Sequence, residues 1–457
     1  LAFMSDLEIE LYKMGIPAKT RHNEVAPGQF EIAPIFSDAN TAADQNHVLM
    51  TTLQSVARRH DFICLLHEKP FVGVNGSGKH INWSMGTDTG LNLLEPSSKP
   101  NENFTFLAVV AMVVEAIFRH GETLRVSIAS HSNDHRLGAN EAPPSIMSVF
   151  LGSTLTRIIE EISTGKESAD VILSELNLGA SQIISIQQDN TDRNRTSPFA
   201  FTGNKFEFRA VGSSASIGVP LCFLNSAVAD VVAETNLMVE KDLSEGKTPQ
   251  EALLNIIQKW YPHARNVVFN GDGYSQAWRD EAKARGLSNL RTTPDVLLAM
   301  QNAGYTEHLS KLGVLSTTEI STYFNVFTER YNKHREIEFE TLCNIIDTNI
   351  IPSALKYKSF LSDVVLKQKE LGGSVFLEKT ILKNLSENLE DLFSKKEALH
   401  STLETVKKLD EHTLALKISN ELLPLSEEIA TICNKIECQI PSDTWNLPSY
   451  LELLFLR

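Results

Sequence analysis

Hydrophobic and polar positions divide the 457-residue chain into two kinds of pattern. From residue 1 to about 230, helical periodicity alternates with short strand-like runs, separated by turns rich in Gly, Pro, Asn and Ser. Beyond that point the periodicity is helical, with Lys and Glu at the polar positions. We therefore expect an α+β domain over residues 1–235 and an all-α region over residues 236–457.

The longest apolar run spans Phe106–Phe118 and is interrupted by Glu115. A run of this length is too short to cross a bilayer. It therefore predicts a buried helix in the core of the first domain, and we expect no membrane partner.

The C-terminal region carries a coiled-coil-like stripe of apolar residues. Its members recur every seven residues, with two leucines between them: Leu385, Leu392, Leu399 and Val406, and Leu389 and Leu403. Glycine and proline interrupt the pattern at Gly372–Gly373 and Pro424. We expect a helical hairpin that serves packing or oligomer contacts, although ordinary amphipathic helices give the same short repeat.

Two carboxylates flank a predicted turn in the segment Asn-Glu-Val-Ala-Pro-Gly-Gln-Phe-Glu, residues 23–31. A turn centred on Pro27–Gly28 places Glu24 directly opposite Glu31. Carboxylates about 5 Å apart repel each other, and a divalent cation removes the repulsion. Oxygen ligands suit Mg²⁺ or Mn²⁺, so the hairpin is a candidate metal site. The alternative is a solvated hairpin with two unrelated surface carboxylates.

A glycine-rich loop, Asn75–Gly78, lies within the segment Lys69–Ser84. Its backbone can approach a ligand closely, but its spacing is not that of a Walker A loop. The strand that follows has a polar face with His80, Asn82 and Ser84 and an apolar face with Ile81 and Trp83. A lone histidine is usually structural, whereas one that leads a polar face beside a glycine loop is a candidate ligand.

A second strand, Thr202–Arg209, also alternates. Phe206 and Phe208 point one way, and Lys205, Glu207 and Arg209 point the other way. The polar face is either a solvated network of ion pairs or a carboxylate metal ligand flanked by cations that bind phosphate or carboxylate. Just upstream, Asp192–Arg195 adds positive charge to the same region.

A fourth polar segment, Asn133–Pro144, contains Gly138 and two consecutive prolines, which predict a loop. It carries Arg136 and Glu141. Polar loops are usually connectors, but a mobile loop with one arginine and one glutamate could close over a site and exclude water.

The composition limits the choice of partners. The formal net charge is −15 and the pI is near 5.4, which argues against nucleic acid and anionic membranes. The five cysteines are scattered without metal-site spacing, which fits a reducing cytoplasm. Leu1 is not an initiator methionine and no signal-peptide pattern follows it, so we expect that another segment precedes it in the natural protein.

Together, the four segments resemble the catalytic domain of glutamine synthetase, in the order and spacing of that family. The wording of Asn133–Pro144, the insertion at about residues 151–188 and the long helical tail are similar to the type III branch. The resemblance implies a glutamine synthetase/guanidino kinase-like fold, in which a curved antiparallel sheet is packed with helices and followed by an all-α region.

The resemblance also implies residue roles. The metal ligands would be Glu24, Glu31, His80 and Glu207; the glutamate contacts Asn75, Gly76, Arg136 and Arg209; the ATP contacts Asn82, Ser84, Arg195 and Lys205; and the catalytic residues Glu141 and Arg195. Two departures from commoner bacterial enzymes bear on the nucleotide contacts. A further arginine after Arg195 is missing from residues 196–201, and Asn82 replaces a histidine.

The implied reaction is ATP-dependent ligation of ammonium to L-glutamate through γ-glutamyl phosphate, with two or three Mg²⁺ or Mn²⁺ ions per site. The implied assembly is a homo-oligomer, a dodecamer of stacked hexameric rings, in which a neighbouring subunit completes each site. The family's N-terminal β-grasp domain and its further metal carboxylates are absent from this sequence. We therefore expect the chain to be inactive by itself.

Three alternatives compete with this reading. One is a γ-glutamyl ligase for another amine, and another is a catalytically silent scaffold subunit. A guanidino kinase is disfavoured, because it would not need Glu24, Glu31, His80 and Glu207 together as metal ligands.

Overall fold

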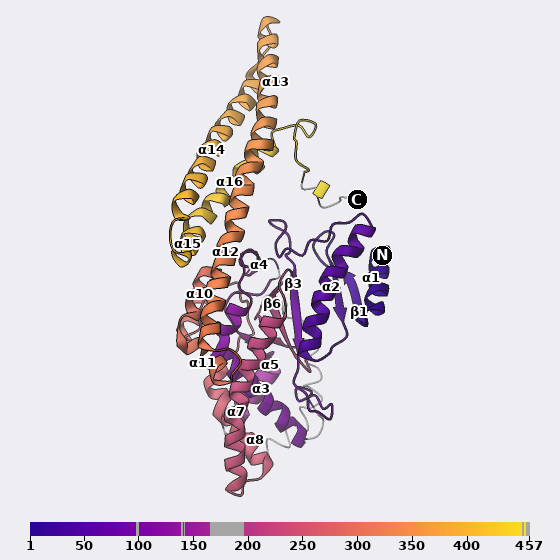
Figure 1. The fold of residues 1–457 in the computed structure, drawn as a ribbon, viewed down its shortest axis with the longest axis vertical. Helices are drawn as coiled ribbons and strands as arrows, with labels where there is room; N and C mark the ends of the chain where they lie inside the picture. The colour runs from indigo at the N-terminus through magenta and orange to yellow at the C-terminus, as the bar shows by residue number, and fades with distance from the viewer. Residues whose placement is uncertain (97–99, 139, 141, 165–195, 450–451, 454–457) are drawn as a thin grey trace. The chain divides into compact units, whose positions relative to one another are not determined.

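The computed structural model describes residues 1–96, 100–138, 140, 142–164, 196–449 and 452–453 (Figure 1). Contacts divide the chain into two compact units, Leu1–Thr322 and Tyr323–Arg457. We call them unit 1 and unit 2 and describe each by itself.

Unit 1 combines two small sheets with helices. Its strands are β1 (Ala18–Asn23), β2 (Phe30–Pro34), β3 (Gly78–Trp83), β4 (Val149–Phe150), β5 (Phe199–Phe201) and β6 (Phe206–Gly212). Its helices are α1 (Ala2–Lys13), α2 (Ala39–Arg59), α3 (Pro100–Ser127), α4 (Asn133–Arg136), α5 (Ser153–Ser163), α7 (Gly218–Ser244), α8 (Pro249–Ala264), α9 (Gln276–Ala284), α10 (Thr293–Met300), α11 (Ala303–Lys311) and the start of α12 (Thr317–Ile345).

The larger sheet has the strand order β3-β6-β5-β4. The expected antiparallel arrangement is confirmed for β3, β6 and β5, while the short β4 runs parallel to β5. One face carries the buried rings of Phe199, Phe201, Phe206 and Phe208. The ring centroids of Phe199 and Phe206 lie 4.7 Å apart in a stacked arrangement. This apolar face leaves the opposite face of β3 and β6 for polar side chains.

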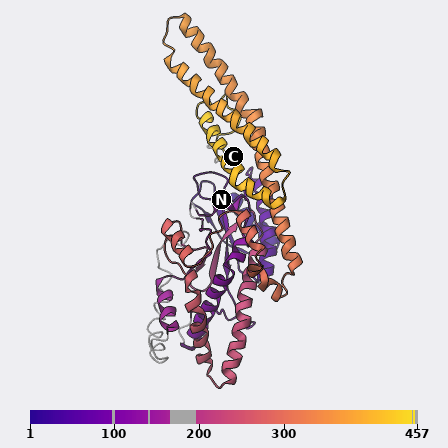
Figure 2. The same cartoon turned by 90° about the vertical axis from the view of Figure 1, so that its left-hand side faces the viewer.

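Helix α3 forms the centre of unit 1. It contacts α7 and α8, which lie beside it in Figures 1 and 2, and Phe106 reaches the ring of Phe201 at 5.6 Å. The predicted buried helix is confirmed, because nearly every residue from Phe106 to Ile117 is fully buried. The helical segment Phe104–Ser127 is long and apolar enough to cross a membrane. However, 83% of its 18-residue apolar stretch is buried inside the protein. Its apolar surface is therefore used for packing.

The change of pattern near residue 235 falls inside α7. Because α7 and α8 pack against α3, the helices between residue 235 and Thr322 belong to the same compact unit as the sheet. The units divide later, between Thr322 and Tyr323. The change in sequence pattern therefore marks a change of secondary structure within unit 1.

Unit 2 contains the rest of α12, followed by α13 (Ile351–Glu370), α14 (Phe376–Val406), α15 (Glu411–Lys417) and α16 (Leu423–Glu437). The helical hairpin is confirmed: α13 and α14 run side by side and are joined at Gly372–Gly373, where Gly372 has a φ of +73° (Figure 2). Two π-helical segments, Ile346–Ile350 and Ile418–Leu422, precede helices that have proline in their first turn. The wider π-helical turn accommodates proline, which has no amide hydrogen to donate to the backbone.

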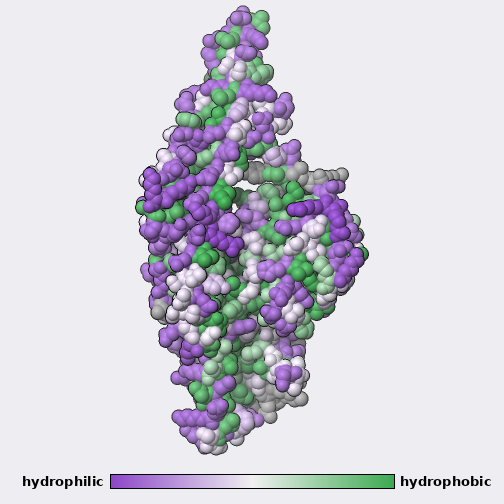
Figure 3. Space-filling model, in the orientation of Figure 1, coloured by the Kyte–Doolittle hydropathy of each residue, from purple (hydrophilic) through white to green (hydrophobic). Residues whose placement is uncertain are grey.

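The predicted apolar stripe of α14 forms the core of unit 2, and all six of its members are buried. Lys396 occupies a buried position within the stripe, and its Nζ lies 3.0 Å from Asp347 Oδ1. Asp347 is itself half-exposed, so the Lys396 ammonium is held at the edge of the seam with its partner in contact with solvent. On the visible face of the hairpin, apolar and polar side chains are interspersed (Figure 3), and Leu371 and Phe376 near its turn are exposed.

A pair of buried histidines links α3 to α11. The rings of His120 and His308 lie 3.8 Å apart, and His120 Nε2 lies 3.1 Å from Asp230 Oδ2. Neither ring nitrogen of His308 has a hydrogen-bond partner among the described residues. Burial lowers the pKa of His308 to about 4, and the charge of the neighbouring His120 contributes a smaller lowering. Burial likewise lowers the pKa of His120, although Asp230 opposes this effect.

This histidine pair predicts a loss of stability in acid. The unfolded chain protonates His308 near pH 6.5, whereas the folded protein keeps this ring neutral down to about pH 4. Stability therefore falls as pH drops between these values. We expect the thermal midpoint to fall by roughly 5 °C more in wild type than in His308→Gln over this range. Equal pH slopes in thermal melts would contradict this, and His47→Gln, at an exposed position, is the control.

Candidate functional site

The β1–β2 hairpin has a different register from the predicted one. His22 pairs with Glu31 and Asn23 with Phe30, so the predicted pairing of Glu24 with Glu31 is wrong. The turn does lie at Pro27–Gly28. However, the hairpin is centred one residue earlier than predicted: the Glu24 amide donates to the carbonyl oxygen of Gln29 at 2.9 Å, so Glu24 lies opposite Gln29. The same register continues along the hairpin and places Glu31 opposite His22.

The shifted register places three ligand-type side chains together. His22 Nε2 lies 2.8 Å from Glu24 Oε1 and 3.4 Å from Glu31 Oε2. One ligand atom from each of the three lies within 4.8 Å of the others. Burial and the neighbouring Glu24 raise the pKa of Glu31. Sequence reasoning missed His22, although its spacing of two residues from Glu24 already placed both on one face of the strand.

The donor chemistry of this hairpin cluster fits a divalent metal ion. Two neighbouring carboxylates are stabilised by a cation, and an imidazole nitrogen adds a third donor. The structure therefore brings Glu24 and Glu31 together, as predicted, but through a different strand pairing from the predicted one.

The second cluster lies on the polar face of β3 and β6. His80 Nδ1 lies 3.1 Å from Glu207 Oε1, and Arg209 Nε donates to Glu207 Oε2 at 2.9 Å. Burial alone would raise the pKa of Glu207, but the hydrogen bonds and charges of His80 and Arg209 lower it to about 2. Glu207 is therefore ionised at neutral pH and available to a cation.

A bulge shapes this second cluster. Lys79 pairs with Val211 and Ile81 pairs with Phe208, so two residues of β6 oppose His80. Arg209 is one of these two residues, and its Nε donates to Glu207 Oε2. The positive charge of His80 also acts on Glu31, which places the hairpin cluster and this one within electrostatic reach.

The glycine loop connects the two clusters. Gln29 Nε2 donates to the carbonyl oxygen of Gly76 at 3.1 Å and to Ser77 Oγ at 3.0 Å, which ties the β1–β2 turn to the loop. Asn75, a predicted glutamate contact, precedes Gly76 in this loop and is partly exposed. The backbone of the loop is thereby held near both the carboxylate hairpin and β3.

The two predicted glutamate-contacting arginines are neighbours and are buried. Arg136 is 4% exposed and Arg209 is 1% exposed. The Arg136 guanidinium donates to the carbonyl oxygens of Arg209 at 3.0 Å and Val211 at 3.3 Å, and to Asn133 Oδ1 at 3.3 Å. The solvated ion-pair alternative for Arg209 is therefore wrong, because its side chain is almost fully buried.

The predicted ATP contacts lie toward the other end of β3. Asn82 is exposed and pairs with Glu207 in the ladder. Ser84 Oγ donates to Asn92 Oδ1 at 2.5 Å, and Asn92 in turn donates to the carbonyl oxygen of Asn204 at 2.8 Å. Lys205 Nζ reaches Asn204 Oδ1 at 3.3 Å. Sequence reasoning missed Asn92, which comes from a loop with no recognisable motif.

The two predicted catalytic residues, Glu141 and Arg195, lie outside the described residues. The neighbours of Glu141 are held by other segments. Lys69 Nζ donates to Asn140 Oδ1 at 3.1 Å, and the Tyr274 hydroxyl donates to the carbonyl oxygen of Ala142 at 2.5 Å.

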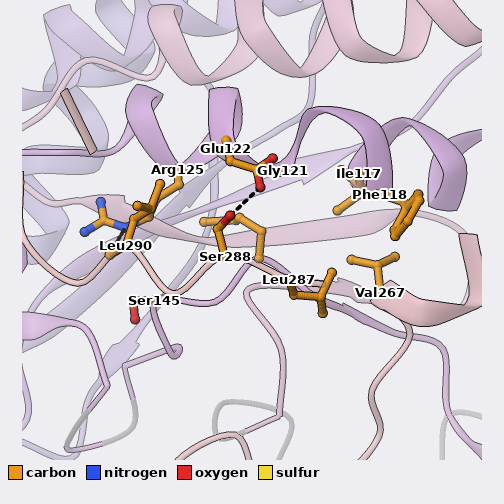
Figure 4. A pocket seen from close by; sticks show the side chains of 11 residues that line it. Ile117, Phe118, Gly121, Glu122, Arg125, Ser145, Val267, Leu287, Ser288 and Leu290 are labelled. Carbon is orange, nitrogen blue, oxygen red and sulfur yellow. Dashed lines mark hydrogen bonds between the residues drawn. The ribbon is translucent and has the colours of Figure 1, made fainter. Parts of the chain in front are cut away.

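A small recess lies beside α3, away from these clusters (Figure 4). Its labelled side chains include Arg125 and Glu122, and Ser288 donates to Glu122 Oε1 at 2.7 Å. None of the residues in the two clusters lines it. It is therefore not part of the candidate site.

Sequence comparison places this chain in a family of ligases. The family profile "Glutamine synthetase, catalytic domain" matches residues 2–133, and "Glutamine synthetase C-terminal domain" matches residues 252–369. The chain belongs to the glutamine synthetase family and is similar to the type III branch over its whole length.

Three relatives support this assignment. "Type-3 glutamine synthetase" of Dictyostelium discoideum is 38% identical over 466 residues, which cover 100% of this chain and 63% of the relative. "Glutamine synthetase" of Bacteroides fragilis is 39% identical, covering 100% and 64%, and that of Butyrivibrio fibrisolvens is 38% identical, covering 99% and 65%. The chain thus spans somewhat less than two thirds of these relatives.

Among solved structures, the Plasmodium falciparum glutamine synthetase is 16% identical, with a TM-score of 0.46. The alignment covers 73% of this chain and 59% of that one.

The hairpin cluster predicts a measurable metal affinity. Glu31→Gln removes one of its two carboxylates, so we expect Mn²⁺ binding at this position to weaken by about tenfold or more. Electron paramagnetic resonance titration of free Mn²⁺ measures this. Glu10→Gln, at the ion pair with Lys13, is the control. Unchanged Mn²⁺ binding in Glu31→Gln would exclude the hairpin as a metal site.

Proposed function

We propose that the protein containing this chain joins ammonia to L-glutamate at the expense of ATP and forms L-glutamine, ADP and phosphate. The observation that carries this proposal is the meeting of His80, Glu207 and Arg209 on one sheet face, within electrostatic reach of the hairpin carboxylates. Family membership supports it, because the whole chain aligns with a type-3 glutamine synthetase and with a second glutamine synthetase.

The first step of the proposed reaction activates a poor electrophile. An oxygen of the glutamate γ-carboxylate attacks the γ-phosphorus of ATP, the bond to the β,γ-bridging oxygen breaks, and ADP leaves. The products of this step are γ-glutamyl phosphate and ADP. Phosphoryl transfer of this kind depends on positioned cations that offset developing negative charge.

Four side chains would hold the divalent ions, Mg²⁺ or Mn²⁺: Glu24 and Glu31 near glutamate, and His80 and Glu207 near the ATP phosphates. When bound, the ions offset the charge of the phosphates and carboxylates. The low pKa of Glu207 keeps this ligand ionised throughout the physiological range.

The remaining predicted residues would bind and orient the substrates. Arg136 and Arg209 would contact the carboxylates of glutamate, with the loop residues Asn75 and Gly76 beside them. Arginine suits this role because its planar guanidinium matches a carboxylate. Asn82, Ser84, Lys205 and Arg195 would contact ATP, with Arg195 offsetting charge during phosphoryl transfer.

In the second step, ammonia attacks the acyl carbon and phosphate leaves as the new C–N bond forms. Glu141 would accept a proton from the bound ammonium and lie on a segment that excludes water from the acyl phosphate. The contacts of Lys69 with Asn140 and of Tyr274 with Ala142, on either side of Glu141 in the sequence, support this proposal.

We further propose a cytoplasmic homo-oligomer, a dodecamer of stacked hexameric rings, in which a neighbouring subunit completes each site. The relatives' additional length supports a role for residues beyond this chain. The domain outside this chain would supply further metal carboxylates.

Removal of the Glu207 carboxylate tests the proposed activity. In the full-length protein, we expect Glu207→Ala to lower ATP- and glutamate-dependent ammonia incorporation by about 100-fold or more, because it removes a metal ligand and the counter-charge of Arg209. Steady-state kinetics measure this, and Glu281→Ala, at the surface ion pair with Arg285, is the control.

Unchanged turnover in Glu207→Ala would overturn the assignment of this site. Activity with methylamine, ethanolamine or a polyamine in place of ammonia would favour a ligase for another amine. Absence of turnover with every amine, together with absence of metal binding, would favour a silent scaffold subunit.

A further inference from the structure

Glu68 is a fully buried carboxylate next to the candidate site. Its relative exposure is 0%, and its Oε1 accepts hydrogen bonds from the Ser214 amide at 2.9 Å and the Ser214 hydroxyl at 2.6 Å. Its Oε2 has no hydrogen-bond partner among the described residues. An ionised carboxylate in such a place is stable only when cations lie near it.

Two facing glycines make room for this group and for Arg136. Gly78 and Gly212 are cross-strand partners at the end of β3 and β6. A Cβ on Gly78 would overlap the Arg136 guanidinium, and a Cβ on Gly212 would overlap the Glu68 carboxylate. Gly76 adjoins both residues, since its Cβ would lie 3.2 Å from Arg136 Cγ and 2.5 Å from the carbonyl oxygen of Glu68.

The hydrogen bonds of Arg136 fix its position without neutralising its charge. Its acceptors among the described residues are two backbone carbonyl oxygens and one side-chain amide oxygen. Burial lowers the pKa of Arg136 to about 10, and the negative charge of Glu68 acts in the opposite direction, ahead of a smaller effect of Tyr274. Glu68 is therefore the main counter-charge of this buried guanidinium.

We propose that Glu68 is a positioning residue for substrate binding. Its buried carboxylate holds the Arg136 guanidinium beneath the glycine loop, oriented toward the carboxylate of the amino-acid substrate. This inference rests on the proposed function, in which Arg136 contacts glutamate. It assigns to Glu68 no contact with the substrate.

Glu68 also joins three chain segments through its backbone and its neighbours. The Ser77 amide donates to the carbonyl oxygen of Glu68 at 2.8 Å, and Ser213 Oγ donates to the carbonyl oxygen of Leu66 at 2.6 Å. A glutamine at this position can keep these bonds, and its side-chain oxygen can also accept the hydrogen bonds of Ser214. Glu68→Gln therefore removes the charge and keeps the shape.

The first experiment is steady-state kinetics of Glu68→Gln in the full-length protein. We expect the KM for glutamate to rise about tenfold or more, with kcat within about threefold of wild type and the KM for ATP unchanged. Glu115→Gln is the matched control, because Glu115 is also fully buried but pairs with Arg119 and His263. It should lower the thermal midpoint and leave the KM for glutamate unchanged.

A second variant displaces the carboxylate without removing it. Gly212→Ala introduces a Cβ where the Glu68 carboxylate lies, so it should raise the KM for glutamate as Glu68→Gln does. A double-mutant cycle then shows whether Glu68 acts through Arg136. In an Arg136→Lys background, Glu68→Gln should change the KM for glutamate by less than about twofold.

Three outcomes would overturn the inference. The first is an unchanged KM for glutamate in Glu68→Gln. The second is a lower KM, which would show that Glu68 only weakens a positive field that attracts glutamate. The third is independent, multiplicative effects in the cycle. Each is read against an active wild-type enzyme, whereas failure of the proposed function appears as wild-type protein that does not form glutamine.

Discussion

The antiparallel pairing of β3 with β6 is the constraint on which the rest of unit 1 depends. It places Ile81, Phe206 and Phe208 in the core and leaves His80 and Glu207 on the opposite face. Each buried aromatic or branched side chain contributes about 1.5–3 kcal/mol, so a slip of one residue is strongly disfavoured. The same burial that stabilises the sheet therefore fixes which charged groups meet.

This arrangement buries charged groups, and the fold offsets the energetic cost of their burial by pairing them. Glu207 lies between His80 and Arg209, and Arg136 is held by the carbonyl oxygens of β6. Burial of a charge without such partners is expensive, but a site with rigid, partly desolvated cations binds anionic substrates well. Glu68 is the corresponding charged partner of Arg136, beneath the glycine loop.

Residues 202–205, predicted as part of a strand, instead connect β5 to β6. Local patterns in the sequence did predict most of β3, the Phe206–Arg209 part of β6, the buried helix α3 and the leucine stripe of α14. Each of these follows from periodicity over several residues. The bulge in β6 could not be predicted, because an extra residue in a ladder leaves no periodic signal. The pairing of Glu24 was wrong because the centre of the turn depends on loop geometry, and the burial of Arg209 was missed because it depends on tertiary packing. Contacts between distant segments, such as Gln29 with the glycine loop, also depend on tertiary packing.

The central claim is that the hairpin and the β3–β6 face form one metal-bearing site. Anomalous diffraction at the manganese edge, from crystals of the full-length protein grown with Mn²⁺ and ADP, tests it most directly. The account predicts one peak bounded by Glu24 and Glu31, and another between His80 and Glu207, with ligand distances of about 2.0–2.3 Å. Peaks only elsewhere, with the hydrogen bond between His80 and Glu207 intact, would contradict it.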